Sequence, residues 1–459
     1  MAQVLTDLAE TRMWVTRQGT TWCSGAVRPT KVLMLAKTRR LAQLQAQLNV
    51  SNGRTTSNMA GLTLSSHFQP IYSLSHSRVV GQEALLRAHD AGGQPVAPPQ
   101  VFARCKTPEE LGWCDSLSRV MHMANFAAVM PPAQWLFLNV HPDTSQLLFR
   151  KEGQEYVREV LSHVGLTADR IVLEVLESAV EDASELEESV TTVREQGCLI
   201  AIDDFGAGHS NFDRVWRLKP DIVKLDRSLV ARAARDGRSR RVVAQMVALL
   251  HECGAMVLLE GVETLDEALL AMEADADMVQ GYFFARPQAD LVPSGHCPDN
   301  LAGLHAGFQN MRQAQQRDRQ EMLAPYRNAI GHAGVSLSMG HSAESACHSF
   351  MSLPATELCY VLDAHGRQID QPVWSTQLLA PSSRQAYTPM NDSHGASWAR
   401  RPYFRRAIEA PGKVQVTRPY RTLNGNHTCV TVSYGFHVQT GQGKETRVVC
   451  GDIIWDGLT

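Results

Sequence analysis

The sequence lacks several features that would assign it to a broad class of proteins. Its formal net charge is only −3, so no excess of basic residues suggests binding to a nucleic-acid polymer or to an anionic membrane surface. No apolar run approaches the ~20 residues that a membrane-spanning helix needs. The first residues are charged and contain no clear apolar core of a signal peptide. We therefore expect a cytoplasmic protein without a membrane span.

The ten cysteines contain no Cys-x-x-Cys pair and are scattered from Cys23 to Cys450. This pattern argues against a zinc cluster and against a disulfide framework, and it favours reduced thiols. The hydrophobic fraction of 44% and the charged fraction of 20% are ordinary for a globular protein. The 459 residues suffice for two or three domains, and one of them could be an α/β barrel of ~250 residues.

Short apolar segments alternate with helical patterns from Phe68 onward. Segments 117–129, 155–164 and 241–253 have apolar residues every three or four positions, which is the helical period. The alternation favours a parallel sheet, and eight strands would close a TIM-type (β/α)8 barrel. Its start would be irregular, because only residues 75–78 separate the first two strands. The predicted strands are 68–74, 79–86, 136–141, 171–176, 199–203, 221–225, 256–260 and 277–283.

The end of the fifth predicted strand is chemically unusual. Asp203 and Asp204 follow an apolar run, and the chain then turns on Gly206 and Gly208. Because side chains alternate along a strand, two neighbouring carboxylates are hard to bury together unless a cation holds them or the strand has ended. Alone, this stretch would more often be an acidic surface turn.

Polar side chains also occur in or just after the other strands from the second to the eighth. Any one of them would more often be a structural or surface residue, but reacting groups of (β/α)8 barrels collect at the C-terminal ends of the strands. If the barrel closes, the series converges on one mouth. In strand order it comprises Glu83, Asn139, Glu174, Glu177, Asp203, Asp204, Lys224, Asp226, Glu260, Glu263 and Gln280.

Such a mouth offers hard oxygen ligands without histidine or cysteine, which suits Mg²⁺ or Mn²⁺ better than Zn²⁺. One or two divalent ions would neutralise the carboxylates, and two ions ~3.5–4 Å apart are a common device for phosphodiester cleavage. Asp203 is the best candidate for a bridging ligand, with Asp204 beside it. Lys224 could orient the attacking water or stabilise charge in the transition state.

At these residues the sequence resembles the EAL family of cyclic di-GMP phosphodiesterases, over roughly residues 65–290. The three letters Glu-Ala-Leu alone would carry little weight, but the ordered set of motifs is highly specific. The motifs are Gln69-Pro70-Ile71, Glu83-Ala84-Leu85-Leu86-Arg87, Leu138-Asn139-Val140, Leu173-Glu174 with Glu177-Ser178, Asp203-Asp204-Phe205-Gly206 with Gly208, Lys224-Leu225-Asp226, Glu260-Gly261-Val262-Glu263 and Gln280-Gly281-Tyr282.

The resemblance implies a barrel that hydrolyses one phosphodiester of cyclic di-GMP to linear pGpG with Mg²⁺ or Mn²⁺. It also implies the following roles. One metal ion would be bound by Glu83, Asn139, Glu174 and Asp203, and Asp204 would bind a second metal or the water. The water would be activated or oriented by Lys224, and Glu260 would be a second-metal ligand or general base. The dinucleotide would be contacted by Gln69 and Arg87, the site would be supported by Glu263 and Gln280, and the loop that begins at Phe205 would be anchored by Glu177.

The sequence departs from the family pattern mainly at His209, where a tyrosine is common. No ligand or lysine position is lost, which favours an enzyme over the alternative of a non-catalytic cyclic di-GMP receptor. An unrelated Mg²⁺-dependent barrel lyase or hydrolase is a distant third possibility. No Gly-Gly-Asp-Glu-Phe-like cyclase signature occurs, so synthesis of this nucleotide is not indicated. The loop that begins at Phe205 is linked to dimerisation in the family, so the resemblance also implies a homodimer.

The remaining segments lie outside this resemblance. Residues 1–62 are predicted to be a weakly ordered extension, and residues 63–295 are predicted to form the barrel. A polar, turn-rich linker is predicted at 51–66, across this boundary. Residues 296–330 predict a linker helix, because apolar residues recur at spacings of three and four. This helix could be a signalling helix or a short coiled-coil contact of a dimer, or it could be a solvated linker packed on one side. Residues 331–459 resemble α+β sensor domains of the PAS/Cache-like kind, which bind small ligands. The resemblance implies a small ligand for this segment but does not identify it. The arginines between 400 and 406 could hold an anion, although a basic face of a surface helix is the simpler interpretation.

Overall fold

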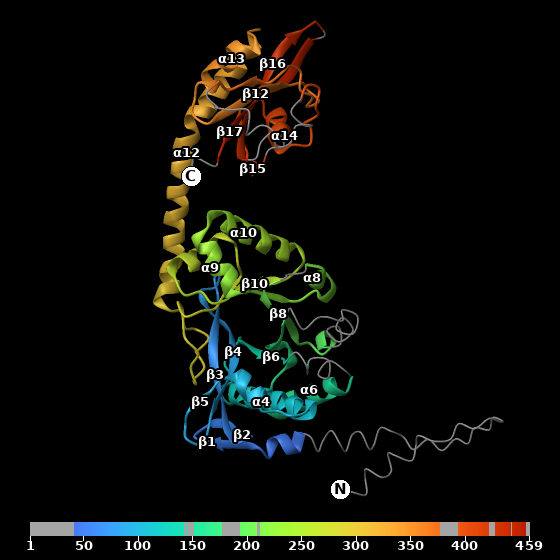
Figure 1. The fold of residues 1–459 in the computed structure, drawn as a ribbon, viewed down its shortest axis with the longest axis vertical. Helices are drawn as coiled ribbons and strands as arrows, with labels where there is room; N and C mark the ends of the chain where they lie inside the picture. Colours follow the sequence, from blue (N-terminus) through green and yellow to red (C-terminus); the bar gives the residue numbers. More distant parts are fainter. Residues whose placement is uncertain are drawn as a thin grey trace, which may run out of the picture. The chain divides into compact units, whose positions relative to one another are not determined.

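A computed structural model of the chain describes residues 41–141, 144, 151–176, 193–208, 212–376, 393–421, 427–441 and 443–455, except for the side chains of 151–156. The chain divides into two compact units, Met1–Phe308 and Gln309–Thr459 (Figure 1). Among the described residues, no helix has the length and apolar character needed to cross a membrane.

Eight strands of the first unit close into a barrel, which confirms the predicted TIM-type fold. Strand β3 runs antiparallel to both its neighbours, β4 and β11, whereas the other six neighbouring pairs are parallel. The irregular start that was predicted from the short connection between the first two strands is therefore an inverted strand. The barrel strands are β3 (Leu62–Ser73), β4 (Arg78–His89), β6 (Trp135–Asn139), β7 (Ile171–Leu176), β8 (Leu199–Phe205), β9 (Ile222–Leu225), β10 (Met256–Leu259) and β11 (Met278–Val279).

Helices cover the outside of the barrel and contribute to its largest apolar core. The three helices predicted at 117–129, 155–164 and 241–253 are present with slightly different bounds. The helix ends follow ordinary capping rules; for example, Thr264 and Glu267 form a capping box at the start of α11. The helices of this unit are α3 (Pro98–Phe102), α4 (Pro108–Val129), α6 (Lys151–Val164), α8 (Phe212–Leu218), α9 (Arg227–Arg235), α10 (Gly237–Glu252) and α11 (Leu265–Glu273), with a 3-10 turn at Ala168–Arg170.

The predicted linker at 51–66 is wrong, because these residues lie largely in strands. Strands β1 (Leu48–Ser51) and β2 (Arg54–Met59) form a hairpin that continues the sheet beside β3, and β5 (Pro95–Val96) pairs with β4. Strand β2 was not predicted, because its residues are mostly polar. Thr55 is nonetheless buried, and its backbone N–H and C=O bond to the Asn125 side chain of α4 at 2.7 and 2.8 Å. Residues 1–40 of the predicted extension lie outside the described residues.

The predicted linker helix is part of α12 (Asp299–Ser338), which contributes to both units. Leu301 and Leu304 belong to the barrel core, whereas Tyr326 and Ile330 belong to the core of the second unit. Residues 312–321 between them are exposed. The boundary between the units thus falls inside the helix, after Phe308, whereas the sequence suggested boundaries before and after a separate linker helix.

The second unit is an antiparallel six-stranded sheet with helices on both faces. Helices α12 and α13 (Ala343–Met351) pack on one face, and α14 (Pro402–Glu409) packs on the other. The sequence predicts a tight turn between the apolar segments 357–363 and 365–369, and this turn is present, with the Gly366 N–H donating to the Asp363 carbonyl at 3.0 Å. A second turn, which the sequence predicts at Asn424-Gly425, lies outside the described residues. The strands are β12 (Thr356–Leu362), β13 (Val373–Trp374), β14 (Val414–Val416), β15 (Tyr420–Arg421), β16 (Thr428–Thr440) and β17 (Gly443–Ile454).

Candidate functional site

An apolar layer inside the barrel lies directly below the polar mouth. Because side chains alternate along each strand, the residue two positions after each inward apolar residue also points inward. In β9, for example, Ile222 belongs to the inner layer, Lys224 follows two positions later, and Val223 and Leu225 pack outward. The inner layer consists of Ile71, Phe137, Val172, Ala201, Ile222, Leu258 and Met278. Two positions after six of these stand Asn139, Glu174, Asp203, Lys224, Glu260 and Gln280.

Four carboxylates surround one buried ammonium group at this mouth. The Nζ of Lys224 lies 2.5 Å from Glu174 Oε1, 2.7 Å from Glu260 Oε1 and 3.0 Å from Asp203 Oδ1. Glu83 Oε1 is farther away, at 3.9 Å. The Lys224 side chain is only 1% exposed, so these carboxylates and not water compensate its charge.

The backbone at the end of β8 explains how two adjacent aspartates can serve one site. The pairing of β8 with β9 shifts register between Ile202 and Phe205, and Asp204 has a left-handed backbone with φ 58°. The Asp204 N–H donates to Asp203 Oδ1 at 3.0 Å. Asp203 is buried and Asp204 is exposed, so the register shift inside β8 places the two neighbouring carboxylates in different surroundings.

Two amide side chains hold Glu83 in place. Asn139 Nδ2 donates to Glu83 Oε1 at 3.1 Å, and Gln280 Nε2 donates to Glu83 Oε2 at 2.7 Å. An amide that donates through its nitrogen keeps its carbonyl oxygen as an acceptor. Asn139 Oδ1 is therefore able to serve as a ligand for a cation.

The mouth holds more carboxyl groups than positively charged groups. Burial raises the pKa of Glu174 well above its usual value and raises the pKa of Glu260 to about 8, and burial also raises the pKa of Asp204. Burial opposes the charge on Lys224, but the surrounding carboxylates, Asp203 first, raise its pKa well above its usual value. Lys224 thus stays protonated, and some of the carboxylates retain protons unless further positive charge arrives.

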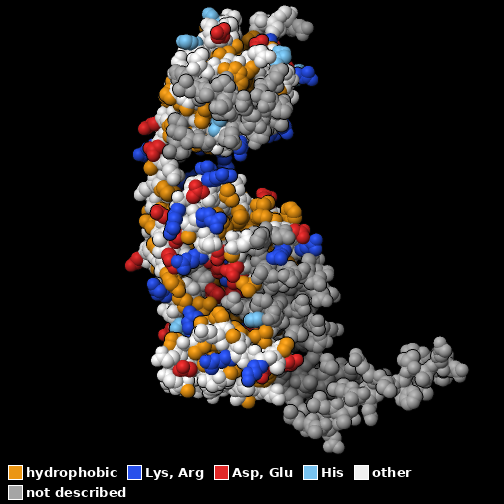
Figure 2. Space-filling view, in the orientation of Figure 1, with side chains coloured by type: hydrophobic (Ala, Val, Ile, Leu, Met, Phe, Trp, Pro, Cys, Tyr) orange, Lys and Arg blue, Asp and Glu red, His pale blue; other side chains and the backbone are white. Residues whose placement is uncertain are grey.

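The donor set fits a divalent cation. Ligand oxygens of Asp203, Asp204 and Glu260 lie within 4.8 Å of one another. Both carboxylate oxygens of Glu174 are buried; Oε1 contacts the Lys224 ammonium, and Oε2 accepts no hydrogen bond from the described residues. Oxygen ligands of this kind are those that hard cations prefer. In Figure 2, acidic side chains gather in a hollow of the first unit.

Not all predicted site residues join this cluster. Glu263 pairs with Arg227 at 2.8 Å, Gln69 Nε2 donates to the Ala285 carbonyl at 3.2 Å, and Arg87 donates to the Leu86 carbonyl at 2.9 Å. Glu177 lies outside the described residues. The cluster itself brings together Glu83, Asn139, Glu174, Asp203, Asp204, Lys224, Glu260 and Gln280.

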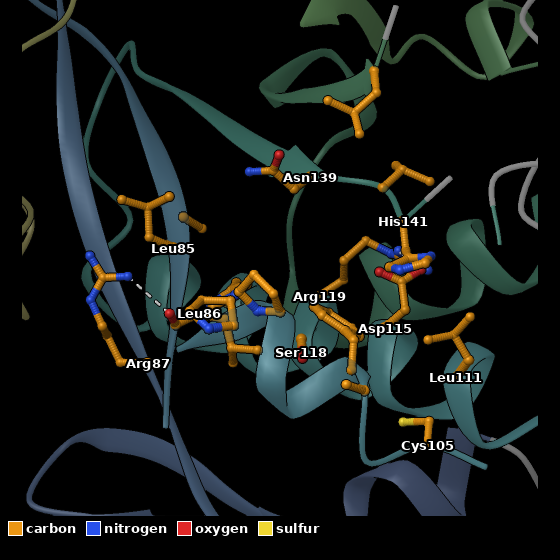
Figure 3. A pocket seen from close by; sticks show the side chains of 18 of the residues that line it. Leu85, Leu86, Arg87, Cys105, Leu111, Asp115, Ser118, Arg119, Asn139 and His141 are labelled. Atoms are coloured by element: carbon orange, nitrogen blue, oxygen red, sulfur yellow. Dashed lines mark hydrogen bonds and ion pairs between the residues drawn. The ribbon is translucent and has the colours of Figure 1, made fainter. Parts of the chain in front are cut away.

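A cavity of about 1060 Å³ opens beside the cluster (Figure 3). Glu83, Arg87 and Asn139 line it together with α3 and α4. Sequence reasoning missed the lining residues of α4, because they belong to none of the motifs. Their signal is a set of polar residues at helical spacing on one face of α4, namely Asp115, Ser118, Arg119 and His122.

Comparisons with known proteins agree on one family. The sequence model described as EAL domain matches residues 56–287, just over half of the chain. The cyclic di-GMP phosphodiesterase RocR of Pseudomonas aeruginosa is 31% identical over 244 residues, which are 52% of this chain and 59% of RocR. The cyclic di-GMP phosphodiesterase NbdA of the same organism is 28% identical over 233 residues, 48% of this chain and 28% of NbdA. The matched region therefore spans well under two thirds of these relatives.

One solved structure resembles the chain over most of its length. The Bacillus subtilis YkuI protein, with an EAL domain, was solved in complex with substrate c-di-GMP and calcium. It has a TM-score of 0.72 and 19% sequence identity, covering 86% of this chain and 96% of that chain. At this level of identity the likeness shows the fold.

Proposed function

Because the chain belongs to the EAL domain family, we propose that it hydrolyses one phosphodiester bond of cyclic di-GMP to give linear pGpG. The observation that carries the proposal is the buried Lys224 ammonium ringed by Glu83, Glu174, Asp203 and Glu260 at the barrel mouth. The names of RocR and NbdA, which are cyclic di-GMP phosphodiesterases, support the same substrate.

We propose that Mg²⁺ or Mn²⁺ is the cofactor. Glu83, Asn139, Glu174 and Asp203 would hold one ion, and Asp204 and Glu260 would hold a second. When bound, such ions supply Lewis-acid stabilisation of the phosphoryl oxygens and acidify the attacking water.

The chain's own residues would carry out the other parts of the reaction. Lys224 retains its protons, so its ammonium donates hydrogen bonds that orient the water or stabilise charge on the phosphoryl oxygens. Burial raises the pKa of Glu260 to about 8, near the pH at which a general base is most effective, so Glu260 would accept the proton of the water if it does not hold the second ion. Arg87, which lines the cavity beside Glu83, would bind a phosphate of the dinucleotide.

We also propose a role for the second unit and an association of two copies of the chain. The second unit would act as a PAS/Cache-like sensor that changes the rate when an unidentified small ligand binds. The protein would work as a homodimer. Light scattering coupled to size-exclusion chromatography measures the dimer independently of catalysis.

Nucleotide turnover tests the proposed activity. The purified chain is mixed with cyclic di-GMP and Mg²⁺ or Mn²⁺, with EDTA in a parallel sample, and pGpG is separated by chromatography. We expect metal-dependent pGpG, its loss in Lys224→Met, and full activity in Lys413→Met, which removes an exposed lysine of the second unit. Tight nucleotide binding without product, by the wild-type chain under all metal conditions, would make the chain a receptor.

A further inference from the structure

Helix α4 carries a buried ion pair on the wall of the cavity beside the carboxylate cluster. Asp115 and Arg119 lie one helical turn apart, with side chains 4% and 8% exposed, and an Arg119 guanidinium nitrogen donates to Asp115 Oδ2. Both residues line the cavity, as do Asn139 and His141 (Figure 3). None of them except Asn139 belongs to the motifs of the sequence.

The same Asp115 oxygen reaches the chain that follows β6. Thr144 Oγ1 lies 2.5 Å from Asp115 Oδ2 and 3.0 Å from the His141 carbonyl, and the Thr144 N–H also donates to that carbonyl at 3.0 Å. A hydroxyl has a single proton, and a bond to a carboxylate is stronger than one to a carbonyl. The Thr144 hydroxyl therefore donates to Asp115 Oδ2, and the Thr144 N–H provides the hydrogen bond to the His141 carbonyl.

This anchored turn begins two residues after Asn139. The Val140 N–H donates to the Glu174 carbonyl at 3.1 Å, and the His141 ring packs against Phe102 with centroids 5.1 Å apart. Val140, His141 and Thr144, on the C-terminal side of Asn139, thus each contact another element of the barrel unit. Asn139 itself is exposed to the cavity, and among the residues that the structure describes its amide bonds to Glu83.

A buried ion pair is weak support for stability, because two well-packed apolar residues often serve as well. An apolar pair cannot provide a fixed acceptor for Thr144. We propose that Asp115, Arg119 and Thr144 are positioning residues that set the direction of the Asn139 amide toward a divalent cation. Arg119 holds the Asp115 carboxylate, Asp115 holds Thr144, and Thr144 closes the turn after β6. This inference rests on the proposed role of Asn139 as a metal ligand.

The test measures Mn²⁺ binding directly, by the electron paramagnetic resonance signal of free Mn²⁺, in the full chain without nucleotide. Thr144→Val removes the hydroxyl at constant shape, and Thr144→Ser restores it. We expect the Mn²⁺ dissociation constant of Thr144→Val to rise about tenfold, the lower end of what outer-shell partners contribute to metal affinity, and to recover in Thr144→Ser. Asp115→Asn should weaken binding in the same direction.

Two further readouts separate positioning from folding. The melting temperature of each metal-free variant reports stability, and Thr55→Val changes another buried threonine, one that contacts Asn125 through its backbone. We expect wild-type Mn²⁺ affinity in Thr55→Val. A lower melting temperature for Thr144→Val with unchanged Mn²⁺ affinity would overturn the inference. Wild-type protein that binds Mn²⁺ without hydrolysing cyclic di-GMP would refute the proposed activity and leave this inference standing.

Discussion

The side chain of Lys224 shows how one residue can organise a site. An ammonium buried to 1% exposure needs compensating charge, and four carboxylates from separate strands supply more than it needs. The surplus negative charge makes the mouth receptive to cations. Glu83 lies farther from Lys224 than the other three carboxylates and has two amide partners, so it can be changed with little effect on the packing around the ammonium.

Replacing Glu83 is therefore expected to abolish turnover without unfolding the protein. We expect Glu83→Ala and Glu83→Gln both to lose at least about 100-fold in turnover, since neither can bind a cation as a carboxylate does. Circular dichroism and melting temperature should stay close to wild type in Glu83→Gln, which keeps the size of the side chain and one amide oxygen that can accept from Asn139 or Gln280. A variant that retains its fold and still turns over at the wild-type rate would exclude Glu83 from the ligand set.

Asp452 of the second unit is a buried carboxyl that the proposed activity does not use. It is 6% exposed, its Oδ1 accepts a hydrogen bond from Thr431 Oγ1 at 2.6 Å, and burial raises its pKa to about 7. Because the folded-state pKa exceeds the unfolded value of roughly 3.9, the stabilising contribution of this group is complete below about pH 4 and is lost as pH rises to about 7.

Asp452→Asn should remove this pH dependence. We expect the second unit of the wild type to lose up to about 4 kcal/mol between pH 4 and pH 8 from this group, and the variant to be the more stable of the two at pH 8. Urea unfolding at several pH values, followed through the transition of the second unit, provides the measurement. Parallel pH profiles for the two proteins would show that Asp452 does not titrate in this range.

At the scale of elements, the end of β8 combines a register shift with a left-handed residue. The φ of 58° at Asp204 costs most residues about 1 kcal/mol or more, whereas asparagine and aspartate tolerate it better. Gly206, two residues after Asp204 and with φ 98°, faces Leu229, where an added Cβ would lie 2.9 Å from Leu229 Cδ2. The local backbone therefore favours Asp or Asn at 204 and Gly at 206.

Two substitutions of Asp204 separate backbone strain from chemistry. Asp204→Asn and Asp204→Ala both remove the carboxylate, so both should lower metal-dependent turnover. We expect Asp204→Ala to be the less stable of the two by about 1 kcal/mol, because alanine disfavours the left-handed conformation. Urea unfolding of the first unit compares them. Equal stabilities would indicate that the backbone relaxes at this position.

At the scale of the whole molecule, helix α12 determines where the chain can be divided. Leu301 and Leu304 are 0% and 1% exposed in the barrel core, while the apolar residues from Leu323 onward belong to the second unit. A boundary at 295, as the sequence suggested, would remove two core leucines from the barrel. A boundary after Phe308 keeps them.

Two truncated chains test this division. A chain that ends at residue 308 should fold and hydrolyse cyclic di-GMP at a changed rate, since every residue of the carboxylate cluster is retained. A chain that ends at residue 295 should be less stable by several kcal/mol, as the loss of each buried leucine side chain costs about 2–5 kcal/mol. Thermal unfolding and pGpG formation compare the two. Loss of activity in a folded 1–308 chain would mean that the second unit is required for catalysis.

Local patterns in the sequence were sufficient for the barrel strands and for most of the chemical groups at its mouth. Strand 171–176 was predicted with its observed bounds, because its apolar and β-branched run between turn signals is a local property. Polar strand β2 was missed, since its inward threonine is satisfied by Asn125, which lies 70 residues away in the chain. The spacing of apolar residues along a segment cannot indicate a hydrogen-bond partner so far away in the sequence.

The sequence by itself determined the closed barrel, the family and the residue types that meet at the mouth. These depend on the period of side chains along strands and helices and on ordered motifs, which are written along the chain. Only the tertiary structure decided that Lys224 stands among four carboxylates, that Asp204 adopts a left-handed backbone and that Asp115 anchors Thr144. Those arrangements depend on distances between segments far apart in sequence, and packing of the closed barrel sets them.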